Sequence, residues 1–113
     1  MSAVATAFQA LADPTRLRLL ELLRGGEHAV NDLAERVPMH QSGVSRHLRI
    51  LQGAGFVDVR RDAQRRLYAL RPDAFAELEG WLASYQRLWE GKLDRLGRAL
   101  EEKGKGRHAR SRS

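Results

Sequence analysis

Residues 41–51 carry the side chains of this sequence whose types and spacing are best suited to recognising a binding partner. At 3.6 residues per helical turn, Val44, Leu48 and Leu51 share one face and form an apolar stripe. A second face collects short polar and basic side chains and no acid: Gln41, Ser42, Ser45, Arg46 and Arg49. Hydroxyls, an amide and guanidiniums match the donors and acceptors of base edges in a DNA major groove, and guanidiniums also attract phosphates. The pattern therefore predicts a helix that reads DNA.

The alternative is an ordinary amphipathic helix, which would normally mix acids with bases on its exposed face. The distribution of the net charge of +6 favours DNA binding. Residues 41–71 have a net charge of +5 and residues 103–113 also +5, whereas residues 1–40 have −1 and residues 72–102 have −3. Affinity for nucleic acids comes largely from counterion release at the phosphates. A nucleic-acid binder needs this partition, and a basic protein without such a partner does not.

Two short helices separated by a tight break would position residues 41–51, and such a pair is a helix-turn-helix. The first helix is expected at residues 31–37, because Pro38 restricts the residue before it and should end the helix there. The second is expected at residues 41–52 and stops at Gly53 and Gly55. Ala34 is small enough to allow the two helices to cross closely.

Two more helices are expected ahead of this motif, at residues 4–11 and 14–24. Asp13 is placed to cap the second helix, and Pro14 suits its first position. Its leucines leave little polar surface, so this helix should lie in the core. Gly25 and Gly26 end it, and residues 28–30 are expected to be extended.

Residues 56–60 and 66–70 are rich in β-branched and aromatic side chains and predict two strands of a hairpin. The polar connection at residues 61–65 lacks the glycine that such turns often contain. Four arginines cluster at the tip: Arg60, Arg61, Arg65 and Arg66. Because like charges repel, this cluster favours contact with DNA phosphates over the alternative of a merely solvated tip.

A long helix is expected from Pro72 to about residue 102, with large apolar residues at spacings of three and four. These residues exceed what a thin core can cover, so part of the stripe is expected to meet a second copy of the chain. The alternative is that the helix folds back on its own domain. The sequence therefore predicts one domain at residues 1–102 and a disordered basic tail at residues 103–113.

The chain resembles the ArsR-type (arsenic-repressor-like) winged-helix transcriptional regulators of bacteria. The resemblance covers residues 5–100. It is carried by residues 10–16 (ALADPTR), 32–34 (DLA), 41–48 (QSGVSRHL), Leu51 and 55–57 (GFV). It implies a mainly α fold with a small β-hairpin wing (α+β), a winged helix-turn-helix that dimerises through its first and last helices. It also implies a homodimeric repressor, expected to act on its own promoter, with helix 41–52 in the major groove of a near-palindromic operator.

Carried over to this sequence, the resemblance places base reading on Gln41, Ser42, Ser45 and Arg46, and backbone contacts on the four arginines of the wing. The polar stripe adds Arg49 to the DNA-binding set. The expected dimer interface draws on both terminal helices: Phe8, Leu11, Leu78, Trp81, Leu82, Tyr85, Leu88, Trp89 and Leu96.

The sequence departs from the metal-sensing members of the family, which use a Cys-x-Cys or Asp/His pairs on the last helix. It has no cysteine, and residues 74–102 have no histidine, so no metal and no cofactor are expected. His47 is interpreted as a packing or supporting group and not a ligand, and His40 as a poor cap. Trp81, Tyr85 and Trp89 resemble the last helix of a cysteine-free branch of the family. These aromatics are expected in the core or interface; the alternative is a pocket for an unidentified small-molecule effector.

Other classes fit the sequence less well. No run of 18 apolar residues is present, and residues 1–11 lack the basic start and apolar run of a signal peptide. The protein is expected to be cytoplasmic and nucleoid-associated, without a membrane partner. No glycine-rich phosphate loop or catalytic spacing suggests an enzyme. Two alternatives stay open, a non-specific architectural nucleic-acid-binding protein and a winged-helix module that binds another protein.

Overall fold

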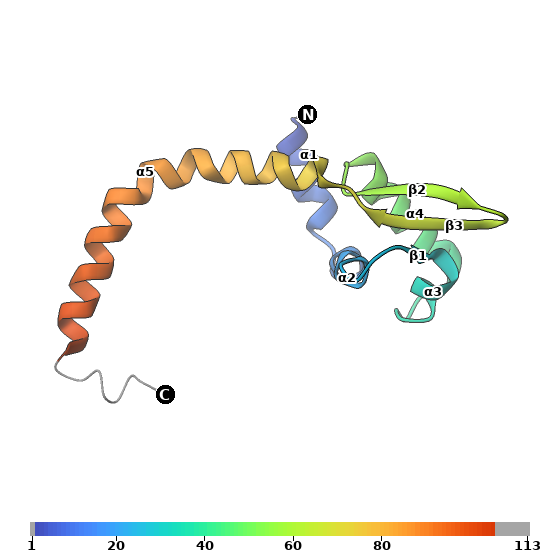
Figure 1. The fold of residues 1–113 in the computed structure, drawn as a ribbon, viewed down its shortest axis with the longest axis horizontal. Coiled ribbons are helices and arrows are strands. Elements are labelled where there is room, and N and C mark those ends of the chain that lie inside the picture. The colour runs from blue at the N-terminus through green and yellow to red at the C-terminus, as the bar shows by residue number, and fades with distance from the viewer. Residues whose placement is uncertain (1, 106–113) are drawn as a thin grey trace. The chain divides into compact units, whose positions relative to one another are not determined.

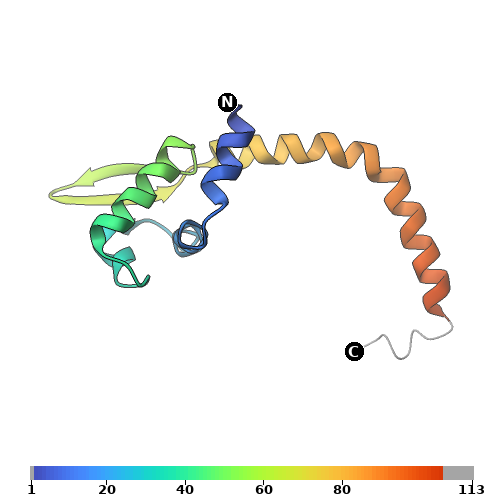
Figure 2. The same cartoon turned by 180° about the vertical axis from the view of Figure 1, so that it is seen from behind.

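The computed structural model describes residues 2–105. Figures 1 and 2 show its elements in chain order: α1 (Ala3–Leu11), α2 (Pro14–Leu23), β1 (His28–Ala29), α3 (Val30–Ala34), α4 (Gln41–Gly53), β2 (Val57–Asp62), β3 (Arg65–Leu70) and α5 (Pro72–Lys105). The strands form one antiparallel sheet in the order β1-β3-β2. The expected class, mainly α with a small β-hairpin wing, is confirmed. Contacts divide the chain into two units that meet between Glu79 and Gly80, so α5 runs through both.

Side-chain caps fix where the first two helices begin. The hydroxyl of Ser2 accepts a hydrogen bond from the backbone N–H of Ala5 at the start of α1. Oδ1 of Asp13 accepts from the backbone N–H groups of Thr15 and Arg16, at 2.8 and 3.0 Å, which confirms Asp13 as the N-cap of α2. These hydrogen bonds lower the pKa of the Asp13 carboxyl below its usual range, and the bond from the Arg16 N–H has the largest effect.

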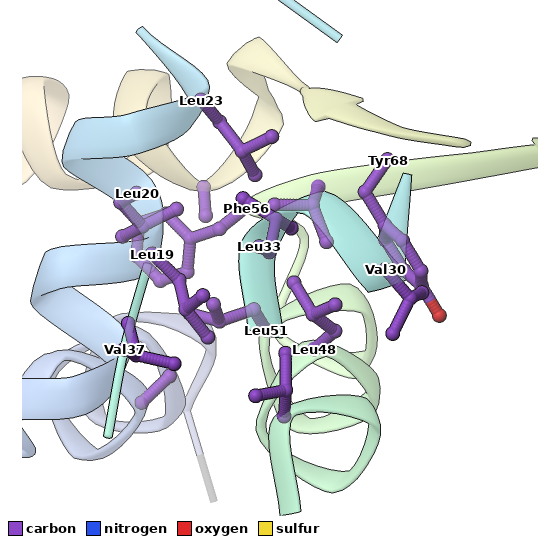
Figure 3. Packing of buried hydrophobic residues seen from close by; sticks show 14 of the residues in the cluster. Leu19, Leu20, Leu23, Val30, Leu33, Val37, Leu48, Leu51, Phe56 and Tyr68 are labelled. Atoms are coloured by element: carbon purple, nitrogen blue, oxygen red, sulfur yellow. The ribbon is translucent and has the colours of Figure 1, made fainter. Parts of the chain in front are cut away.

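The core of the first unit forms where α2, α3 and α4 meet the sheet. In Figure 3, Phe56 lies among the leucines of α2 and α3, and Tyr68 of β3 lies beside Val30. The fully buried side chains come from all these elements: Leu19, Leu23, Leu33, Val44, Leu48, Leu51, Phe56, Val57 and Tyr68. The core therefore fixes the back of α4 against three other elements and leaves its opposite face outward.

The helix-turn-helix has a shorter first helix than expected. α3 ends at Ala34, four residues before Pro38, so the expectation that Pro38 ends it was wrong. The following turn is held by bonds from Arg36 N–H to the Leu33 carbonyl and from Met39 N–H to the Val37 carbonyl. This turn carries Val37 into the core, where its burial outweighs another helical turn.

Gly43 leaves room for the side chain of Met39 against α4. A Cβ at this position would lie 2.7 Å from Cγ of Met39, closer than packed carbon atoms allow. The Met39 side chain packs across the first turn of α4 at residue 43, and a side chain there would force it to take another rotamer.

The wing is a tighter hairpin than expected. β2 and β3 extend to Asp62 and Arg65, which pair directly, so the connection is the two residues 63–64 and not the five of residues 61–65. Ala63 takes up the turn with φ of 59°, a conformation that glycine adopts more easily. In both ribbon views the hairpin projects beyond the end of α4.

Helix α5 begins in the first unit. Ala74 and Leu78 are buried in the core there, and the ring of Phe75 packs edge-on against Phe56 at 4.9 Å between centroids. The helix continues to Lys105, three residues beyond the expected end at residue 102. The rest of the expected tail, residues 106–113, lies outside the described residues.

Candidate nucleic-acid interface

The two faces of α4 are separated as the residue spacing predicts. Val44, Leu48 and Leu51 are 0% exposed. The opposite face carries Gln41, Ser42, Arg46 and Arg49, all exposed, and Ser45, which is half-buried. The helix therefore presents the expected polar and basic side chains outward from a base held in the core.

The charge on this face is not neutralised by any carboxylate of the described residues. α4 contains no acid, and among residues 2–105 neither Arg46 nor Arg49 has a carboxylate partner. His40 is the N-cap of α4, and its side chain makes no capping bond, in agreement with its expected weakness as a cap. The free N–H groups of the first turn add a partial positive charge at the exposed N-terminus.

An open hollow of about 250 Å³ brings α4 and the wing together. Its lining comes from the start of α3, the start of α4 and the hairpin: Ala29, Val30, Asn31, Gln41, Ser45, Gln64, Arg65 and Arg66. Two predicted base-reading residues and two predicted wing arginines thus share one surface. Ser42 and Arg46 lie outside this hollow, on the exposed face of α4.

A second open hollow, of about 280 Å³, lies between the C-terminal half of α4 and the wing. It is lined by Arg49, Gln52, Val59, Arg60, Arg61, Arg66 and Tyr68. Gln52 was missed by the sequence prediction, although its spacing from Ser45 and Arg49 puts it on the same helical face. Asn31 and Gln64, in the first hollow, carry no such periodic signal, because only the fold brings them beside α4.

The four wing arginines divide into two that have a carboxylate partner and two that have none among the described residues. Arg60 donates two hydrogen bonds of 2.8 Å to the carboxylate of Glu27, and Arg65 contacts Asp62 at 3.4 Å. The bonds from Arg60 lower the pKa of Glu27, and the pKa of the Arg60 guanidinium is raised in turn. Arg61 and Arg66 face each other across the strands, and within the described residues neither has an ion-pair partner.

Most of the residues predicted for a dimer interface are exposed in the single chain. Leu88 is 69% exposed and Trp89 50%, and exposed or half-buried apolar residues accompany them: Phe8, Leu11, Trp81, Leu82, Tyr85 and Leu96. Leu78 differs, because it is 9% exposed in the core of its own chain and has little surface left for a partner. The ring of Trp81 packs edge-on against Tyr85, and the Lys92 ammonium lies 5.5 Å from the Trp89 ring centre.

No three side chains of the types that bind metals come together within residues 2–105. None of the helices described there has a stretch long and apolar enough to cross a bilayer.

Known proteins show the same architecture. Residues 11–60 match the family described as "Helix-turn-helix domain". The HTH-type transcriptional regulator Rv2034 of Mycobacterium tuberculosis is 36% identical over 98 residues, which cover 87% of this chain and 89% of the relative. The transcriptional repressor SdpR of Bacillus subtilis is 32% identical over 78 residues, 69% of this chain and 87% of the relative.

Two solved structures agree with these relatives. The crystal structure of an ArsR family transcriptional regulator superposes with a TM-score of 0.74 at 34% identity, covering 79% of this chain and 98% of that one. The homodimeric winged helix-turn-helix DNA-binding domain of a possible ArsR-family regulator from Mycobacterium bovis has a TM-score of 0.60 at 31% identity, covering 82% and 83%. The chain therefore belongs to the ArsR family of winged helix-turn-helix transcriptional regulators.

Proposed function

We propose that this protein is a homodimeric repressor that binds a near-palindromic operator, with α4 in the major groove and the wing on the sugar-phosphate backbone. One observation carries the proposal. The polar face of α4 is exposed and has no acid, while the opposite face of the same helix is fully buried in the core. A helix held from behind can enter a groove about 12 Å wide without losing its orientation.

The side chains on α4 divide into two chemical tasks. Arg46 and Arg49 carry the long guanidiniums, which pair with guanine O6 and N7 or with phosphates. Gln41, Ser42 and Ser45 are shorter, and they suit base edges close to the helix axis. Ser45 is half-buried and lines the first hollow, so its hydroxyl could bond only to a base that enters this hollow.

The wing supplies affinity that does not depend on sequence. Arg61 and Arg66 are opposed in the strand register, where like charges destabilise a sheet. A phosphate near them removes this repulsion and releases counterions. Arg60 and Arg65 already hold carboxylates, so we assign the larger share of phosphate contact to Arg61 and Arg66.

A second copy of the chain is the proposed partner of the apolar face of α5. Large apolar side chains remain exposed along this helix, and the similar domain from Mycobacterium bovis is homodimeric. Two copies related by a twofold axis would place two α4 helices on half-sites about 34–36 Å apart, one turn of DNA. Repression at the chain's own promoter is proposed by analogy with relatives named as repressors.

Selection from a pool of random duplexes, followed by footprinting of the purified protein on the selected DNA, tests the proposal. The expected result is two protected segments of related, inverted sequence, one helical turn apart. Protection without sequence preference would contradict it and indicate an architectural DNA-binding protein. No retention of any duplex at low salt would also contradict it and indicate a module that binds another protein.

A further inference from the structure

The side chain of Arg16 joins three helices. Its Nε donates to the carbonyl of Ala10 at 2.6 Å, and its Nη2 donates to the carbonyl of Gln9 at 3.3 Å. Its Nη1 lies 3.0 Å from Nδ1 of His47, in the middle of α4. One guanidinium on α2 thus contacts the end of α1 and the back of the DNA-reading helix.

Both ends of Arg16 are fixed. Its backbone N–H donates to Oδ1 of Asp13, the N-cap of α2. Its side chain donates to the Ala10 carbonyl and adds a second donor to the Gln9 carbonyl, which also accepts from the backbone N–H of Ala12. Carbonyls in the last turn of a helix carry a partial negative charge, which favours a guanidinium there. The guanidinium is therefore held at a defined position relative to α1. Its contact with His47 constrains the position of α4 relative to α1 as well.

The contact with His47 requires one form of the imidazole. A guanidinium has donors and no acceptor, so Nδ1 must offer a lone pair and the ring must carry its proton on Nε2. A doubly protonated ring has no lone pair and would place two cations 3.0 Å apart.

The charged groups around His47 come from the elements packed against α4. α2 contributes Arg16, and the N-cap of α2 contributes Asp13, whose negative charge would attract a protonated ring. α1 has no ionisable side chain, and α4 itself adds the exposed Arg46 and Arg49. The charged residues of α3 and β2 make no hydrogen bond to His47: Asp32, Asp58, Arg60, Arg61 and Asp62.

We propose that Arg16 is a positioning residue for DNA recognition: through the neutral His47 ring it sets the orientation of α4 relative to α1. This inference rests on the proposed function. Its consequence is that operator binding, but not binding to unrelated DNA, weakens when the ring becomes protonated. Contacts to base edges require α4 to lie within a fraction of an ångström of its productive position. Contacts to phosphates tolerate a small tilt of the helix.

The test measures fluorescence anisotropy on a selected operator and on a scrambled duplex between pH 7.5 and 5.5, at constant salt. For the wild type we expect operator affinity to fall about tenfold and scrambled-duplex affinity not to fall. His47→Asn, whose side-chain oxygen replaces Nδ1 and does not titrate, should hold its operator affinity over this range. Arg16→Gln should lose about tenfold already at pH 7.5 and then stay flat. His28→Asn, at the half-buried histidine of β1, is the control and should keep the wild-type profile.

A wild-type profile in His47→Asn would overturn the proposal, as would a loss in Arg16→Gln that is equal on both duplexes. NMR of the ring nitrogens in the DNA-free protein gives an independent readout, with the Nε2–H tautomer expected for His47. An Nδ1–H tautomer would overturn the positioning role alone. A wild type that does not discriminate the two duplexes at any pH would overturn the proposed function and the positioning role with it.

Discussion

Helix α4 and the β2–β3 hairpin both present arginines, but in different settings. On α4, Arg46 and Arg49 stand on a face without acids and have no ion-pair partner within residues 2–105. On the hairpin, Glu27 and Asp62 neutralise half of the arginine cluster. The number of arginines in the sequence therefore overstates the charge that the wing can offer to DNA. Under the proposed function, the helix would supply specificity, and the wing would supply an affinity smaller than its composition implies.

The largest effect is expected from removing the support of α4. Leu48→Ala deletes a side chain that is 0% exposed and should lower the free energy of unfolding by about 2–5 kcal/mol. Ile50→Ala, two residues away on the same helix at 42% exposed, is the control and should cost much less. Urea denaturation measures both. Equal losses would show that the core does not hold α4 in the way described.

Arg46→Ala tests whether α4 makes base-specific contacts or only phosphate contacts. It should cost about 1–3 kcal/mol on the selected operator and much less on a scrambled duplex, because a lost base contact removes discrimination. Arg24→Ala removes an exposed arginine at the end of α2 and serves as the control. Anisotropy titrations measure both duplexes. An equal loss on the two sequences would assign Arg46 to phosphates.

The two classes of wing arginine can be separated by salt. Arg66→Ala should weaken binding to every sequence and lower the slope of log K against log salt by about 0.9. Arg65→Ala should change that slope less, because Asp62 already offsets its charge. Binding titrations at salt concentrations from about 50 to about 200 mM measure the slopes. Identical slopes for the two variants would remove the distinction between paired and unpaired arginines.

The smallest effect concerns the Glu27–Arg60 pair, which is exposed and screened by water. Since Arg60 lowers the pKa of Glu27, the pair stabilises the fold above the pKa of the unfolded carboxyl. That contribution is lost as the pH falls through the lowered pKa. Between pH 5 and 3, the melting temperature of Glu27→Gln should therefore fall slightly less than that of the wild type. A steeper fall in the variant would contradict the sign of this shift.

Much of the fold could be predicted from local signals. The cap at Asp13, the opposite faces of α4 and the hairpin depend on residues close in sequence, and these predictions are confirmed. The end of α3 was not predictable, because the helix gives way before Pro38 to a turn that buries Val37 against residues distant in the sequence. The roles assigned to the polar face of α4 and to α5 stay predictions.

The sequence by itself determined the family, the elements and the side of α4 that faces outward, because helical spacing and charge are local properties of the chain. Only the tertiary structure decided which polar side chains far apart in the sequence meet. It joined Glu27 to Arg60, 33 residues apart, and Arg16 to His47, 31 residues apart. Such contacts depend on where separate elements meet when apolar surface is buried, and no spacing along the chain encodes that meeting directly.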